Sequence, residues 1–270
     1  MLWKLMKYEF RATARLFLPL YLAVIMLGLL ASFSLGMTTN QSEFLKVLGV
    51  LCIILFGIML YAMVLLSVIL MLVRFYRNLM TDEGYLMFTL PVSVSQLIFS
   101  KLIVSLVWFV GSALVAVLAI YPMTVNPIIT GEFNGTSLIK TVVENLLTSL
   151  PVDAHTRTLL IVEGASLTVL SVIAFCLMSY AAISVGQSFR KNKVLLSIVF
   201  LFVFNMVSQI FYQTLQVGMS LRLKYRIVTN FWGMPEVQQM LLGSILVSLV
   251  LCVGYYFLTH YMLKRRLNLQ

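Results

Sequence analysis

Few side chains of this sequence are suited to chemistry, and the clearest set lies in the apolar run 194–217. Asn205, Gln209, Tyr212 and Gln216 recur at intervals of four, three and four residues, which places them on one stripe of a helix. Lipid hydrocarbon offers such a stripe no hydrogen-bond partners. We therefore expect it to face other helices, a second subunit or an aqueous path, and the spacing alone does not decide among these three.

The other reactive side chains predict no catalytic, cofactor-binding or metal site. Cys52, Cys176 and Cys252 fall inside apolar runs, where we expect them to pack as small apolar side chains. His155 and His260 have no Cys, Asp or Glu at ligand spacing. The sequence also lacks the G-x-x-x-x-G-K-[ST] phosphate loop, so we do not expect this chain to bind ATP by that route or to be an enzyme.

Composition places these residues in a membrane protein. The chain is 61% hydrophobic and only 10% charged, so it cannot present a solvated surface all round. Six apolar runs can cross a hydrocarbon core of about 30 Å, which takes roughly 20 helical residues. They cover residues 16–35, 45–73, 97–120, 159–186, 194–217 and 237–262. We expect an all-α integral membrane protein in which residues 1–270 form a single transmembrane domain of six spans.

Lys and Arg predict the orientation of these spans. Of the 19 Lys and Arg residues, thirteen lie on the side that carries both termini and residues 74–96, and six lie on the other side. The positive-inside rule makes the first side cytoplasmic and leaves segments 121–158 and 218–236 outside. The formal charge of +10 is dispersed in small juxtamembrane groups, which argues against nucleic acid as a partner.

The N-terminal segment 1–15 is amphipathic at helical spacing. Lys4, Lys7, Arg11 and Arg15 follow one face, and Trp3 stands near the opposite one. We expect an interfacial helix on the inner leaflet, with its cations against anionic lipid headgroups. A cleavable signal peptide is the alternative, but run 16–35 is longer than the usual hydrophobic region.

Two further patterns concern the spans themselves. Gly28, Ser32 and Gly36 form a small-residue series that favours close helix packing. A similar series in the last span contains Ser244, Ser248 and Cys252. Glu163 is the one acid inside a predicted span, where it either reaches the interface or takes part in proton or cation binding.

The segment between the second and third spans is conspicuously patterned. Thr81 is suited to cap a short helix whose first turn would carry Asp82 and Glu83, and large apolar residues follow before Pro91. Ser93 and Gln96 then form a capping box at the start of the third span. The apolar face of this helix would rest either on the membrane surface or on a soluble partner.

The run TDEGYLMFTLPVSVSQLIFSK, from Thr81 to Lys101, resembles the corresponding loop of ABC-2 type transporter permease subunits, most closely the small six-span permeases of Gram-positive bacteria. In that family the loop contains a coupling helix that fits a groove on a cytoplasmic ATPase. The resemblance implies that the ATPase contacts are made by Asp82, Glu83, Gly84, Tyr85, Leu86 and Phe88.

The resemblance further implies an exporter permease in a bacterial cell membrane. Two separate ATPase subunits would carry ATP and Mg, and a second permease chain, identical or related, would complete the assembly. Asn205, Gln209, Tyr212 and Gln216 would then line a translocation path or a dimer interface. Amides and Tyr beside abundant Phe and Met would suit amphipathic cargo such as a peptide or a drug, and they would equally suit simple packing. The alternatives are an ATP-independent secondary transporter or channel and a membrane anchor or scaffold subunit.

Overall fold

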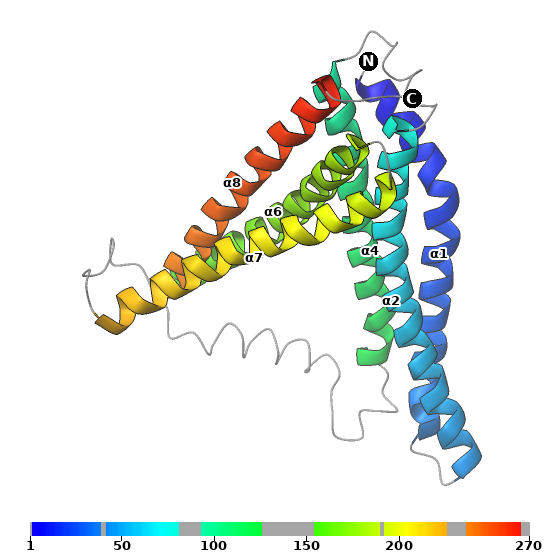
Figure 1. The fold of residues 1–270 in the computed structure, drawn as a ribbon. Coiled ribbons are helices and arrows are strands. Elements are labelled where there is room, and N and C mark those ends of the chain that lie inside the picture. The colour runs from blue at the N-terminus through cyan, green and yellow to red at the C-terminus, as the bar shows by residue number, and fades with distance from the viewer. Residues whose placement is uncertain are drawn as a thin grey trace. The chain divides into compact units, whose positions relative to one another are not determined.

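The computed structural model describes residues 2–38, 42–80, 93–125, 154–189, 192–225 and 236–265, and these ranges are helical almost throughout, with no strand among them. Figure 1 shows the helices, coloured from blue to red along the sequence. They are α1 (Leu2–Thr38), α2 (Glu43–Met80), α4 (Val94–Val125), α6 (Ala154–Gln187), α7 (Lys193–Tyr225) and α8 (Glu236–Arg265). All six are long and apolar enough to cross a membrane, so the described chain has the character of a multi-pass membrane protein.

Each of the six predicted spans lies inside one of these helices, so six helices long and apolar enough to cross a membrane are confirmed. The boundary drawn at residues 15 and 16 is not a helix end, since α1 continues from Leu2 through Pro19 to Thr38. Spanning helices tolerate such a proline when neighbouring groups satisfy the freed backbone. The placement of residues 1–15 on the membrane surface stays a prediction.

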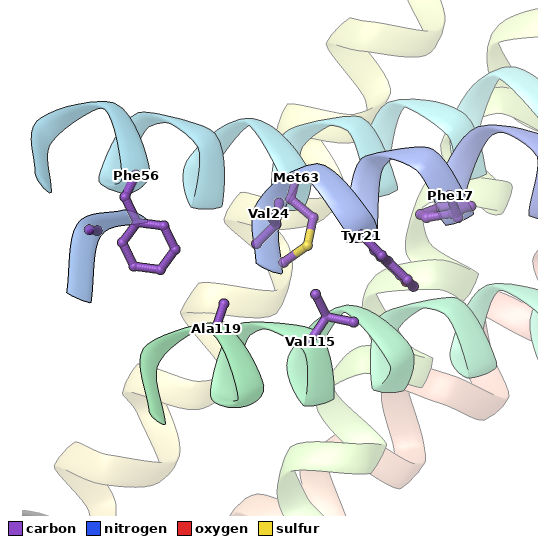
Figure 2. Close-up of a cluster of buried hydrophobic side chains, with 8 residues drawn as sticks. Phe17, Tyr21, Val24, Phe56, Met63, Val115 and Ala119 are labelled. Atoms are coloured by element: carbon purple, nitrogen blue, oxygen red, sulfur yellow. The ribbon is translucent and has the colours of Figure 1, made fainter. Parts of the chain in front are cut away.

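The helices form two compact units, residues 1–71 with 103–151 and residues 72–102 with 152–270. In the first unit, α1 packs against α2 and α4 through an apolar cluster whose side chains point toward one another in Figure 2. Its fully or nearly buried members are Phe17, Tyr21, Val24, Ala31, Phe56, Met63, Val115 and Ala119. This cluster explains why the first three spans associate.

Polar groups fix the register of the same three helices. The hydroxyl of Tyr21 on α1 donates to the carbonyl oxygen of Trp108 on α4 at 2.9 Å and lies 2.9 Å from the Ser112 hydroxyl. Ser112 lies 3.1 Å from the Ser67 hydroxyl on α2. Because hydrocarbon would leave these groups unpaired, the chain of hydroxyls favours one relative position of the helices.

In the second unit, α7 and α8 both pack against α6 (Figure 1). The second half of α6 is buried from Cys176 to Gln187 and is rich in Ala, Ser and Gly, which lets neighbouring backbones approach closely. The closest approach is at Gly186, where an added Cβ would lie 2.5 Å from the backbone nitrogen of Ser197 on α7. Asn192, with φ of 54°, reverses the chain between the two helices, a conformation that Asn tolerates.

Candidate functional site: a pocket among α6, α7 and α8

A pocket of about 450 Å³ lies among the last three helices, at mid-span in each of them. Its described lining consists of Leu167, Thr168, Ser171, Ala174, Phe175 and Met178 from α6, Asn205, Ser208, Gln209 and Tyr212 from α7, and Ser244, Leu251 and Tyr255 from α8. Its volume falls in the range of small-molecule sites. Three helices therefore line an open, ligand-sized space at a depth where the surroundings would be hydrocarbon.

The chemistry of the lining is amphipathic and uncharged. Aliphatic, aromatic and thioether side chains supply an apolar wall, and hydroxyls and amides supply hydrogen-bonding groups. None of the described lining residues carries a formal charge. The pocket is therefore suited to a molecule that is partly apolar and partly hydrogen-bonding.

Most of the hydroxyls in the pocket are already engaged. The hydroxyls of Ser208 and Tyr255 lie 2.7 Å apart, and both lie within 3.0 Å of the Phe204 carbonyl oxygen. Tyr212 pairs with Ser248 of α8 at 2.8 Å. These bonds hold α7 against α8 and leave their hydroxyls little capacity for a ligand.

The two amides of the pocket are in a different state. Asn205 and Gln209 lie one helical turn apart on α7, and both are exposed. Neither forms a hydrogen bond with any other residue in the described chain. Each amide has two N–H donors and a carbonyl acceptor, so this wall of the pocket offers unused hydrogen-bonding capacity in the middle of a span.

A second polar pair joins α6 to α8 about one turn from the pocket. The Gln238 side-chain nitrogen donates to one carboxyl oxygen of Glu163 at 2.9 Å. The other carboxyl oxygen of Glu163 is buried and has no partner among the described residues. The pair ties together the ends of α6 and α8 on the side of the pocket near Thr158.

The structure brings together most of the predicted polar stripe. Asn205, Gln209 and Tyr212 all line the pocket, whereas Gln216 is exposed and is not part of the described lining. The stripe therefore faces α6 and α8 within its own chain over this length. The spacing alone left open what this stripe faces, and its role as a translocation path or a dimer interface stays a prediction.

The small-residue series lies elsewhere, in the first unit. An added Cβ at Gly28 would lie 2.5 Å from the Ala119 carbonyl oxygen on α4. Ser32 donates to the Pro122 carbonyl oxygen at 2.8 Å. Gly36 lies within α1.

The predicted ATPase contacts Asp82, Glu83, Gly84, Tyr85, Leu86 and Phe88 lie outside the described residues. The helix ends on either side of them are described. Phe75 of α2 stacks on Tyr180 of α6 with ring centroids 4.0 Å apart, and both side chains are 1% exposed. On α4, the predicted cap is present, since the Gln96 backbone nitrogen lies 3.4 Å from the Ser93 hydroxyl oxygen.

The start of α4 is also tied to α8. The Tyr256 hydroxyl donates to the Ser95 hydroxyl oxygen at 3.0 Å, and the Phe99 and Tyr256 ring centroids lie 5.4 Å apart. His260 Nδ1 lies 3.5 Å from the same Ser95 oxygen. Both helix ends that flank segment 81–92 are thus packed on helices that line the pocket.

Sequence reasoning missed the α6 wall of the pocket. Thr168, Ser171, Phe175 and Met178 follow one another at three, four and three residues, which is the spacing of one helix face. That spacing was available in the sequence. It is hidden because the polar members are small hydroxyl residues, which are common in spans and bond to their own helix carbonyls, as Thr168 does to Gly164 at 2.9 Å.

Within the described ranges, no three His, Cys, Asp or Glu side chains are grouped to hold a metal ion. Cys52, Cys176 and Cys252 are free thiols. No family model, curated protein or solved structure matches the chain. The function is therefore inferred from the site and the sequence alone.

Proposed function

We propose that this chain is the permease subunit of an ATP-driven exporter and that the pocket among α6, α7 and α8 belongs to its translocation path. The proposal rests on the contacts that connect segment 81–92 with the walls of the pocket. The two helix ends that enter and leave segment 81–92 are packed on α6 and α8, and these two helices form two walls of the pocket. A force applied to the segment would reach the pocket through direct contacts.

The coupling path has two arms. One arm runs from the end of α2 through the Phe75–Tyr180 stack to α6. The other runs from the start of α4 through Ser95 and Tyr256 to α8. Aromatic stacks and hydrogen-bonded hydroxyls transmit displacement well because a packed interior responds by moving as a body.

The sequence of segment 81–92 indicates which kind of partner binds it. Its resemblance to a coupling helix favours a cytoplasmic ATPase, and the absence of a phosphate-loop motif in the chain requires that ATP and Mg bind to separate subunits. Two ATPase subunits and a second permease chain would complete the exporter in a bacterial cell membrane, with both termini of this chain in the cytoplasm. ATP binding would draw the segments of the two permease chains together and alter access to each pocket.

A secondary transporter is the second candidate, and Glu163 is the observation that favours it. A buried carboxyl oxygen without a partner, near the end of a span, is suited to proton binding in an ion-coupled carrier. The exporter remains the better-supported proposal because an ion-coupled carrier would have no use for the patterned segment at Thr81–Phe88.

Co-purification from native membranes tests the exporter proposal. We expect an ATPase to accompany the solubilised chain, and we expect the double substitution Tyr85→Asp and Leu86→Asp to release it, because an unpaired charge would be buried in the ATPase groove. Phe44→Asp is the matched control, since it places an acid at an exposed aromatic position on the opposite end of α2. Retention of the ATPase by the double variant, or the absence of any ATPase, would reject the proposal.

A further inference from the structure

The two unpaired amides of the pocket, Asn205 and Gln209, specify the kind of molecule that it accepts. Span Lys193–Gly218 has its midpoint near Asn205, so both amides would lie deep in the hydrocarbon region. An amide at that depth is stable only with a hydrogen-bond partner, because hydrocarbon supplies none. The described chain offers neither amide a partner, so one has to come from outside it.

The shape of the site favours a small molecule over a helix of a second chain. The amides face a concave space of about 450 Å³ with walls from three helices, not a flat helix surface. A second copy of the chain would present a convex helix to this space. A ligand with a compact head and a slender apolar part fits it better.

The absence of formal charge in the described lining limits which molecules the pocket can bind. The nearest acid along α6 is Glu163, which is engaged by Gln238, and the described lining itself contains no charge. A charged head would therefore enter a low-dielectric site without a counter-charge, which carries a large desolvation penalty. An uncharged head avoids that penalty and can satisfy both amides.

We propose that this pocket binds an uncharged amphiphile whose amide, ester or hydroxyl head hydrogen-bonds to Asn205 and Gln209 and whose apolar part packs on Phe175, Met178 and Leu251. The donor and acceptor groups of each amide match a head that both donates and accepts. The apolar wall supplies the rest of the contact. This amphiphile would be the cargo of the exporter, so its assignment as cargo rests on the proposed function.

Photo-crosslinking of the purified full-length chain tests whether the pocket prefers an uncharged head group to a charged one. Three probes are used, each a twelve-carbon chain with a diazirine at its end, and they differ only in a carboxamide, carboxylate or trimethylammonium head. We expect the carboxamide probe to label peptides of α6, α7 and α8 at the pocket and the two charged probes to label them at least about tenfold less. Equal labelling by all three probes, or labelling confined to lipid-facing residues, would overturn the proposal.

Variants then test the role of the amides. Asn205→Leu with Gln209→Leu should lower pocket labelling by the carboxamide probe about tenfold, the loss expected for two neutral hydrogen bonds. Gln213→Leu is the control, because it removes an exposed amide of the same helix that lies outside the described lining, and we expect less than a twofold effect. Equal effects of the double variant and of this control would refute the assignment. The comparison of the three probes on the unaltered chain tests the preference for an uncharged head group even if a variant folds poorly.

Two competitors distinguish the sources of such an amphiphile. Loss of labelling in the presence of dioctanoylglycerol assigns the occupant to membrane lipid, and loss in the presence of an acetylated and amidated trileucine peptide assigns it to peptide cargo. If neither competitor reduces the labelling, the assignment of the occupant to an uncharged amphiphile is contradicted. None of these measurements needs an ATPase or nucleotide, so failure of the binding site and failure of the exporter proposal are separate results.

Discussion

The close approach of α6 and α7 at Gly186 makes a quantitative prediction for Gly186→Ala. An added Cβ would lie 2.5 Å from the Ser197 backbone nitrogen and 2.6 Å from its Cα, whereas ordinary van der Waals contact begins near 3.4 Å. The two helices would have to separate by several tenths of an ångström at least, since two of the three obstructing atoms belong to the Ser197 backbone and the third is its Oγ. Overpacking of this kind costs about 1–3 kcal/mol.

Gly164→Ala supplies the matched control on the same helix. No atom lies within 4 Å of an added Cβ at Gly164, so this substitution should gain the helix-forming advantage of Ala over Gly, about 0.5–1 kcal/mol. The free energies of unfolding of the two variants should therefore differ by about 1.5–4 kcal/mol.

The assay is equilibrium unfolding with sodium dodecyl sulfate in mixed micelles, followed by circular dichroism and by the fluorescence of the three tryptophans. We expect Gly186→Ala to unfold at lower detergent fraction than the unaltered chain and Gly164→Ala to unfold at the same or a higher fraction. Equal midpoints for the two variants would refute the packing of α6 on α7 as described.

Two further predictions concern polar groups within the spans. Tyr21→Phe should lower the free energy of unfolding by about 0.6–1.7 kcal/mol, the range for hydrogen bonds between membrane helices. Tyr61→Phe, at a 67% exposed position, should have no measurable effect in the same unfolding assay. Equal effects of the two substitutions would contradict the hydrogen-bonded chain of hydroxyls. Gln238→Leu should lower the free energy of unfolding by about 1–3 kcal/mol because it leaves the Glu163 carboxyl unpaired, and adding Glu163→Leu should recover most of that loss. A double variant less stable than Gln238→Leu would contradict this reasoning.

The helical framework could be predicted from the sequence because hydrocarbon thickness sets one length for every span. Each of the six apolar runs is long enough, and each is a helix. The continuity of α1 was not predicted, since Lys7, Arg11 and Arg15 marked a change of environment and Pro19 follows soon after. A change of environment need not end a helix, because backbone hydrogen bonds are satisfied within the helix in both media.

The pocket could be predicted only in part. The spacing of Asn205, Gln209 and Tyr212 identified one wall, because large polar residues in a span are conspicuous. Which helices face that wall depends on tertiary packing, and here it depends on the small residues of α6 and on the Ser208–Tyr255 and Tyr212–Ser248 pairs. Hydroxyl residues alone do not reveal such pairing in a sequence, since each can bond to its own helix instead.

Access to the pocket as a function of ATP tests the central claim most directly. The three cysteines are replaced by serine, Gln209→Cys is introduced, and the chain is reconstituted in liposomes with its ATPase. The control is Phe202→Cys, at an exposed apolar position of α7 that is not part of the described lining. The exporter proposal predicts that ATP changes the rate at which a membrane-impermeant maleimide labels Gln209→Cys several-fold and leaves Phe202→Cys unchanged. The same rate at Gln209→Cys with and without ATP, in the presence of a bound and active ATPase, would contradict it.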